Sequence, residues 1–214
     1  MGISIRRATH GDVPFLAEVV LLASRSHLPR GVWDFLVPDD VGRGRFLAQL
    51  LATGPASWCH WRNFLVCEVD GVPAAGLSGY AEDEPDMLSE DDAIGQALSL
   101  VGVSEAEAAA GFERLGPFLT CLMPPIGMPW IVEWVATLPA FRRRGLVDGL
   151  LREVLAEGRR RRRRRAQIMV IDGNVSAQRV YERVGFVVHE VRHTAPFRDL
   201  MGSPGLVRLS QRVR

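Results

Sequence analysis

The sequence predicts an α/β fold in which a central sheet, with both antiparallel and parallel strand pairs, is flanked by helices. In the first half of the chain, two apolar runs surround Asp70-Gly71, a pattern typical of an antiparallel hairpin. In the second half, strand-like and helix-like segments alternate, which favours parallel pairing. The 214 residues contain no internal repeat and no linker, so we expect one domain over 1–214.

The first half begins with a strand and a helix. Residues 3–8 alternate apolar and polar side chains, as in a half-buried strand. Turn and capping residues at 9–12 precede a helix that runs through Ser24, with Pro14 in its tolerant first turn. The remaining elements predicted here are a helix over 39–53 and the hairpin strands 64–69 and 72–79.

The middle of the chain is helical and acidic. Between Glu82 and Arg114 there are ten Asp or Glu residues and one basic residue. A proline-rich loop follows at 124–129. We therefore predict a helical insertion over about 81–129, directly before the central strand. The elements predicted after it are strands at 130–138, 166–171, 186–191 and 206–212 and helices at 146–157 and 174–184.

Composition limits the class of protein. No apolar run approaches the roughly 20 residues that span a bilayer, and the N-terminus does not resemble a secretory signal. We therefore expect a cytoplasmic protein that does not associate with a membrane. Cys59, Cys67 and Cys121 lack metal-ligand spacing, and we expect buried thiols and no metal site. All 26 basic residues are arginine, which is typical of GC-rich bacterial coding.

Seven consecutive arginines at 159–165 dominate the charge pattern. The formal net charge is +1, so the rest of the chain carries −6. Such a run could bind nucleic-acid phosphates. However, no aromatic residue is interleaved and no nucleic-acid motif surrounds it. We therefore favour a solvated helix end, where arginine complements the helix dipole, and expect no nucleic-acid partner.

The turn before the helix at 146–157 has the features of an anion site. Arginines occupy 142–144 and Gly145 follows them, between a strand and a helix start. The first amides of a helix have no intrahelical acceptor, and together with the dipole they favour a phosphate. Glycine at this point lets a phosphate approach closely.

A second stretch places polar and small residues on one helical stripe. Asn174 is a good N-cap, and Gly185 is a good helix stop. Asn174, Ala177 and Tyr181 fall on one face, and the first and last are roughly 10 Å apart along the axis. Taken alone, this pattern also fits a short amphipathic helix with a structural role.

Together the two stretches resemble the GNAT superfamily of CoA-dependent N-acetyltransferases. Residues 142–147 match its Q/R-x-x-G-x-G/A signature except at Val147, and the pattern Asn174-x-x-Ala177-x-x-x-Tyr181-x-x-x-Gly185-Phe186 matches its second motif at each position. The resemblance is specific over 133–186 and looser over 3–79, and it does not extend to 81–129. It implies a GNAT-like fold that uses acetyl-CoA as acyl-donor cosubstrate. The residues implied in cofactor binding are Val135, Ala136, Thr137, Arg142, Arg143, Arg144, Gly145, Leu146, Val147, Asn174, Ala177 and Tyr181.

The resemblance also implies a mechanism in which a primary amine attacks the thioester directly. Tyr181 would protonate the departing thiolate. Glu133 is our candidate base, because the strand alternation predicts that it shares a face with Val135 and Thr137. A salt-bridged Glu133 at an exposed strand end is the alternative. His189 and His193 are further candidates, although a single histidine after a strand is more often structural.

The acceptor and the assembly stay open at this stage. A small amine or a peptide amine fits the resemblance, and a homodimer is common among such proteins. The acidic insertion favours a cationic acceptor by electrostatic steering, or it is a solvated helical face. Val147, where the family has Gly or Ala, could crowd the phosphate. This position leaves a catalytically impaired acyl-CoA sensor as an alternative function.

Overall fold

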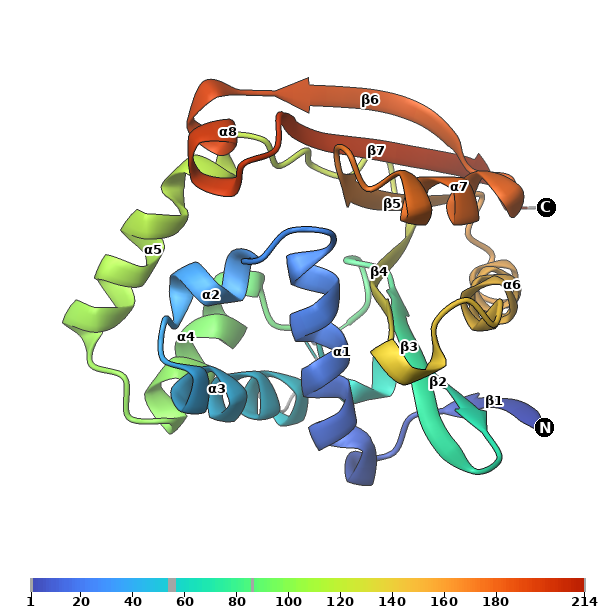
Figure 1. The fold of residues 1–214 in the computed structure, drawn as a ribbon, viewed down its shortest axis with the longest axis horizontal. Coiled ribbons are helices and arrows are strands. Elements are labelled where there is room, and N and C mark those ends of the chain that lie inside the picture. The colour runs from blue at the N-terminus through green and yellow to red at the C-terminus, as the bar shows by residue number, and fades with distance from the viewer. Residues whose placement is uncertain (1, 54–56, 86, 214) are drawn as a thin grey trace.

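A computed structural model describes residues 2–53, 57–85 and 87–213. The described residues form a seven-stranded sheet in the order β1-β2-β3-β4-β5-β7-β6 (Figure 1). Only β4 and β5 among the described strands pair in parallel, so the predicted mixed α/β sheet is confirmed. The strands are β1 (Ile3–Arg7), β2 (Phe64–Val69), β3 (Val72–Tyr80), β4 (Trp130–Thr137), β5 (Arg165–Ile171), β6 (Val187–His193) and β7 (Gly205–Arg212).

Helices cover both faces of the sheet. They are α1 (Val13–Arg25), α2 (Val32–Leu36), α3 (Asp40–Ala52), α4 (Glu90–Leu100), α5 (Glu105–Leu119), α6 (Leu146–Arg160), α7 (Val175–Arg183) and α8 (Ala195–Met201), with short 3-10 turns η1 (His10–Asp12), η2 (Trp61–Asn63) and η3 (Pro139–Phe141). The predicted elements occur within three residues of their expected bounds. The helices α2 and α8 were not predicted, because five and seven residues are too few to show a helical period.

Two hydrophobic clusters fill the two sides of the sheet, and β4 contributes to both. Trp130 and Val132 belong to the cluster under α6, whereas Ile131 belongs to the cluster that includes α1 and α3. This alternation follows from the two-residue period of a strand. Because β4 is covered on both faces, its sequence is an almost continuous apolar run.

The acidic insertion consists mainly of α4 and α5, as predicted. Ile94 and Leu98 of α4 and Leu115 of α5 are buried in the cluster on the α1 side. In Figure 1, α5 lies at the outer end of the helices that cover this side. Asp86, one of the ten acidic residues counted above, lies outside the described residues. The insertion is thus part of the layer that covers one face of the sheet.

The arginine run is paired with the insertion. The helix α6 ends at Arg160, as expected for a helix terminus. Arg163 forms an ion pair of 2.7 Å with Asp83, and Arg161 pairs with Glu84 and, at 2.9 Å, with Glu157. These carboxylates already neutralise two of the charges that a nucleic acid would need.

Candidate active site

The strands β4 and β5 separate partway along their length. They pair only from Trp130 to Val132, opposite 166–168 of β5 (Figure 1). The second half of β4, which contains Val135 and Thr137, therefore has no β5 partner. A strand edge with unpaired amides and carbonyls can hydrogen-bond an extended ligand. The sequence-predicted segment 135–137 lies on this edge.

A β-bulge in β4 decides which way its side chains point. Ala136 pairs with Gly76 and Glu133 pairs with Ser78, so two residues of β4 oppose one residue of β3. Trp134, within the bulge, has a positive φ of 53°. An extra residue breaks the alternation of faces. Val135 packs on the α6 side, whereas Trp134 packs on the α1 side.

The bulge overturns one prediction about Glu133. The carboxyl interacts with Tyr80 and Cys59, which both belong to the cluster on the α1 side. Glu133 and Val135 therefore lie on opposite faces, and the expectation of a shared face is wrong. Simple alternation fails here because the register shift is set by pairing with β3, which local sequence does not reveal.

Glu133 has an environment that suits a base. Burial raises the pKa of its carboxyl to about 8, with further increases from Glu90 and Glu82, while a hydrogen bond with Tyr80 lowers it. Its Oε2 atom is buried and has no hydrogen-bond partner among the described residues. Within that same part of the chain Glu133 forms no ion pair, so the salt-bridged alternative is not observed. A carboxyl with a perturbed pKa and one oxygen without a hydrogen-bond partner is typical of functional sites.

The start of α4 lies close to this carboxyl. Ser57 forms a parallel bridge with Leu88, which brings the first residue of α4, Glu90, near the segment that contains Cys59. Glu90 raises the pKa of both Glu133 and Cys59. Glu90 and Tyr80 were not singled out from the sequence, because no local pattern places either beside β4.

Two tryptophans contact each other on the side of the sheet that Glu133 faces. Trp33 of α2 and Trp134 have ring centroids 5.6 Å apart. Their indole N–H groups are buried and make no hydrogen bond to any described residue. Trp33 was not predicted as a site residue, since it lies in a short helix about 100 residues from β4. The pair adds an aromatic wall on the same side of the sheet as the carboxyl.

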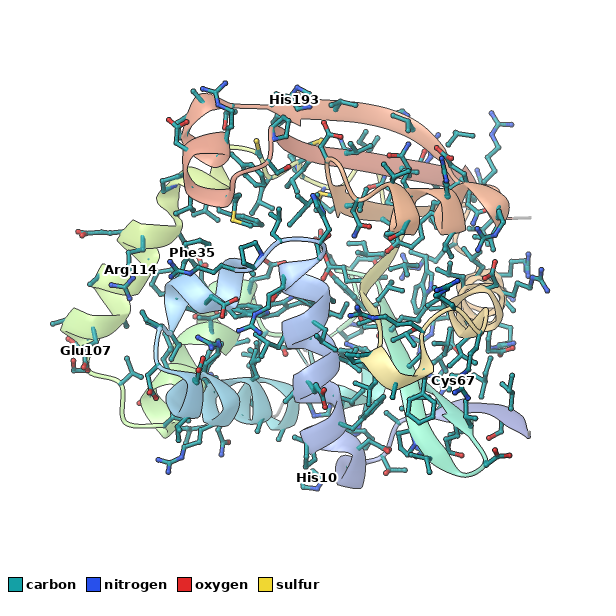
Figure 2. All side chains as sticks on the ribbon, in the orientation of Figure 1. His10, Phe35, Cys67, Glu107, Arg114 and His193 are labelled. Atoms are coloured by element: carbon teal, nitrogen blue, oxygen red, sulfur yellow. The ribbon has the colours of Figure 1, made fainter. Side chains whose placement is uncertain are left out.

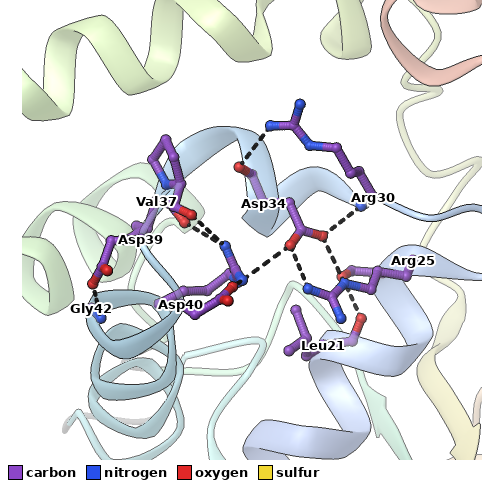
Figure 3. Close-up of polar contacts among 12 residues, drawn as sticks. Leu21, Arg25, Arg30, Asp34, Val37, Asp39, Asp40 and Gly42 are labelled. Atoms are coloured by element: carbon purple, nitrogen blue, oxygen red, sulfur yellow. Dashed lines mark hydrogen bonds and ion pairs between the residues drawn. The ribbon is translucent and has the colours of Figure 1, made fainter.

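An ion-pair network holds α2 in place (Figure 3). Asp34 accepts hydrogen bonds from Arg25 of α1 at 2.6 and 2.9 Å and from the Gly31 amide at 2.7 Å. Arg43 of α3, which is buried, lies 3.3 Å from the same carboxylate. Figure 2 shows that Arg114 of α5 also points toward α2, where it donates to the Phe35 carbonyl at 2.8 Å. The helix α2, which contains Trp33, is therefore held from three other helices.

The arginine-glycine turn, formed by residues 142–145, leads from η3 into α6. Arg143 and Gly145 have positive φ values of 65° and 70°. In the described part of the chain, no acceptor is bound to the amides of Gly145, Leu146 and Val147. A Cβ on Gly145 would meet only a carboxylate oxygen of Asp148, at 4.0 Å. Free amides and open space at a helix start suit a diphosphate.

The other residues of this turn stabilise it. Arg142 donates from Nε to the Thr137 carbonyl at 3.3 Å. The guanidinium of Arg144 lies 5.4 Å from the ring centre of Phe141. Val147 is half-buried and packs against the hydrophobic cluster under α6. Its branched side chain therefore fills core volume. The effect of Val147 on phosphate binding stays a prediction.

Asn174 is the N-cap of α7, as predicted. Its Oδ1 accepts from the Ala177 amide at 3.1 Å, and its Nδ2 donates to Ser26 Oγ at 2.6 Å. Ala177 itself is half-buried on the α6 side. The side chain of Asn174 thus ties the start of α7 to the end of α1. A direct contact between Asn174 and a cofactor stays a prediction.

Tyr181 is buried on the same side of the sheet as Val135. Its ring meets Phe186 edge-on, with centroids 6.4 Å apart. Burial raises the pKa of the phenol well above its usual range, so the hydroxyl keeps its proton at any physiological pH. Tyr181 and Glu133 are therefore on opposite sides of β4, with the unpaired strand edge between them.

The two histidines lie elsewhere. Both are on β6, where Figure 2 labels His193. The strands β5 and β7 separate β6 from β4. His189 is exposed, and His193 Nε2 lies 2.8 Å from Asp172 Oδ2.

Over 2–53, 57–85 and 87–213, no three His, Cys, Asp or Glu side chains are grouped to hold a metal ion. None of the helices in these ranges is long and apolar enough to cross a bilayer.

Comparison with solved structures supports the fold. An acetyltransferase structure matches with a TM-score of 0.70 and 20% identity, covering 99% of this chain and 100% of that one. A putative acetyltransferase from Salmonella typhimurium, solved with its cofactor acetyl-CoA, matches with a TM-score of 0.57 and 17% identity over 100% and 95%. A polyamine N-acetyltransferase from Drosophila melanogaster matches with 0.58 and 13% over 99% and 100%.

The sequence comparison covers the same segment as the site. A search of curated proteins gives no match. The family model described as the acetyltransferase (GNAT) family matches residues 43–186, which is more than half of the chain and includes β4, the arginine-glycine turn and α7. The predicted resemblance is thereby confirmed, and the chain belongs to the GNAT acetyltransferase family.

Proposed function

We propose that the protein transfers the acetyl group of acetyl-CoA to a primary amine of a small molecule or peptide. The observation that carries this proposal is the unpaired edge of β4, with the Glu133 carboxyl on one side and the Tyr181 phenol on the other. The family membership supports acetyl transfer in general.

The donor fits the groups that the structure brings together. The pantetheine arm would pair with the backbone of 135–137, and the diphosphate would bind the amides of 145–147. Arg142, Arg143 and Arg144 add positive charge at this turn. Asn174 and Ala177 would border the arm from α7. The likeness to a protein solved with acetyl-CoA supports this assignment.

The reaction needs a neutral amine and a protonated leaving group. Glu133 would remove a proton from the ammonium, after which the nitrogen attacks the thioester carbonyl carbon. A backbone N–H near Val135 would stabilise the oxyanion of the tetrahedral intermediate. When the carbon–sulfur bond breaks, Tyr181 would donate its proton to the thiolate. The attacking nitrogen would lose its second proton to water as the neutral amide forms, Glu133 would release its proton to water, and Tyr181 would regain a proton from water. The opposite placement of Glu133 and Tyr181 lets the amine and the thiolate occupy different sides of the strand.

We further propose that the acceptor is cationic beyond its reacting amine. Glu82 and Glu90 lie near Glu133 and raise the pKa of its carboxyl, so a positive charge is stabilised there. The half-buried Trp134, which packs against the buried Trp33, offers a ring for a cation–π contact. The similarity to a polyamine N-acetyltransferase is consistent with such a substrate.

Release of CoA with a panel of amines tests the proposal. The panel should contain a diamine, a guanidino amine, a neutral alkylamine and a peptide with a free N-terminus. We expect turnover that is fastest with the dicationic compounds. Thermal shift with acetyl-CoA, compared with salt-dependent retention on DNA, separates the enzyme from a nucleic-acid protein. Stabilisation by acetyl-CoA without turnover of any amine would favour an acyl-CoA sensor instead.

A further inference from the structure

A groove outside the proposed acetyl-transfer site lies between α6 and α7. It has a volume of about 420 Å³ and is bordered by the second half of α6, the end of α7 and the end of β7. This volume is in the range of small-molecule sites. Arg152, on its rim, is six residues beyond Leu146, or roughly 9 Å along the helix from the amides of the arginine-glycine turn. The groove is therefore separate from that turn.

Arginines line the groove from two helices. Arg152, Leu155 and Arg159 are spaced by three and four residues, so they project from one face of α6. Arg183 projects from α7 and is held by Asp148 at 3.1 Å. No described residue that lines the groove is acidic. Together with Arg212 of β7, four arginines thus line a concave surface that has no carboxylate among its described lining residues.

A buried amide adds a neutral donor. Gln211 of β7 lines the groove, and its Nε2 atom is buried without a hydrogen-bond partner among the residues described. Gly185 has a φ of 100°, and a Cβ there would lie 3.0 Å from Gln211 Oε1. Only glycine lets the end of α7 approach this amide so closely. An unsatisfied buried donor calls for an acceptor that the chain does not provide.

We propose that this groove binds a small, multiply charged anion of the phosphate-ester or polyphosphate class. Guanidinium groups bind phosphate oxygens through paired hydrogen bonds. Arg183 is held by Asp148, whereas Arg152 lines the groove and forms no ion pair with another described residue. Gln211 would donate to a further oxygen of the same ligand. The site is independent of the acetyl-transfer proposal, because it uses none of the residues assigned to that reaction.

Titration with inorganic pyrophosphate tests the site. The full-length protein is first saturated with CoA, so that the turn at 142–147 is covered, and pyrophosphate binding is then measured by calorimetry. The variants are Arg152→Gln and Gln211→Leu, and the matched control is Arg45→Gln, an exposed arginine of α3. We expect roughly tenfold weaker binding in Arg152→Gln, weaker binding in Gln211→Leu and no change in the control.

The side-chain amide of Gln211 provides a second readout. Its nitrogen and proton resonances, assigned by their loss in Gln211→Leu, should shift when pyrophosphate is added to the CoA-saturated protein. The proposal is overturned if CoA abolishes pyrophosphate binding, because the anion would then occupy the cofactor's own phosphate site. Equal binding by Arg152→Gln and the wild type would also overturn it. If the protein does not bind CoA, the acetyl-transfer proposal fails on its own. The groove is then tested by comparing pyrophosphate binding of Arg152→Gln and Gln211→Leu with that of the wild type in the absence of CoA.

Discussion

Glu133 illustrates how burial sets the chemistry of a single residue. Because the pKa of its carboxyl is raised to about 8, the protonated form dominates at pH 7 and the basic form appears as the pH rises. We therefore expect kcat/KM to increase through about pH 8. Glu133→Gln should lower kcat/KM by about 10²- to 10⁴-fold and remove this ionisation. Rates between pH 6 and 10 for both proteins provide the measurement.

The acceptor amine also loses a proton over part of this range, so the variant serves as the control. A rise shared by both proteins belongs to the substrate, and only the difference between the profiles belongs to Glu133. If Glu133→Gln had the wild-type profile and rate, another group or a water chain would be the base.

Tyr181 allows a test on the other side of the strand. Tyr181→Phe keeps the ring that packs against Phe186 and removes only the hydroxyl. We expect kcat to fall by about 10²-fold or more, while the melting temperature stays close to that of the wild type, because the core contact is preserved. Steady-state kinetics and thermal unfolding give the two values. Intact turnover would show that Tyr181 is not the acid.

At the scale of elements, the contact between α6 and the sheet depends on glycine. A Cβ on Gly79 of β3 would lie 2.3 Å from Val154 Cγ2 and 2.9 Å from the Trp130 ring. The helix can therefore approach β3 only because that position has no side chain. The position of the arginine-glycine turn at the start of α6 follows from this packing.

We expect Gly79→Ala to destabilise the protein by about 1–3 kcal/mol through overpacking. Gly44→Ala is the matched control, since a Cβ there meets nothing within 4 Å in the middle of α3. The control should be neutral or stabilising by up to about 1 kcal/mol. Urea unfolding measures both free energies. Equal stability of the two variants would mean that α6 shifts without cost.

At the scale of the whole molecule, the acidic insertion faces the proposed acceptor side. We expect kcat/KM for a dicationic amine to fall roughly tenfold between about 0.02 and 0.5 M NaCl, because salt screens electrostatic steering. Glu90→Gln should reduce this dependence, since Glu90 lies near Glu133. Initial rates at several salt concentrations measure it, with a neutral alkylamine as the control. A rate that does not depend on salt would leave the insertion as a solvated helical layer.

The insertion also has a structural partner across the molecule. Arg161 and Arg163 reach Glu84 and Asp83, so the long arginine run and the acidic stretch compensate each other. The near-zero net charge of the chain therefore combines two segments of opposite sign that lie together in the fold. Neither segment alone indicates this pairing.

The sequence by itself determined the elements with long periodic patterns and the family. The hairpin around Asp70-Gly71, the long helices and the motif from Asn174 to Phe186 depend on short-range spacing, which a linear chain displays directly. The Asn174 cap and the start of α6 after Gly145 were predictable for the same reason. Local hydrogen bonds and helical period decide them.

The tertiary structure alone decided how these pieces meet. The bulge at Trp134 turned Glu133 away from the face of Val135, because strand register is set by pairing with β3. Short helices such as α2 have no period to detect, and Trp33 reaches β4 only through packing and the Asp34 network. The burial that shifts the Glu133 pKa comes from segments far apart in the chain. Such long-range contacts leave no local trace in the sequence.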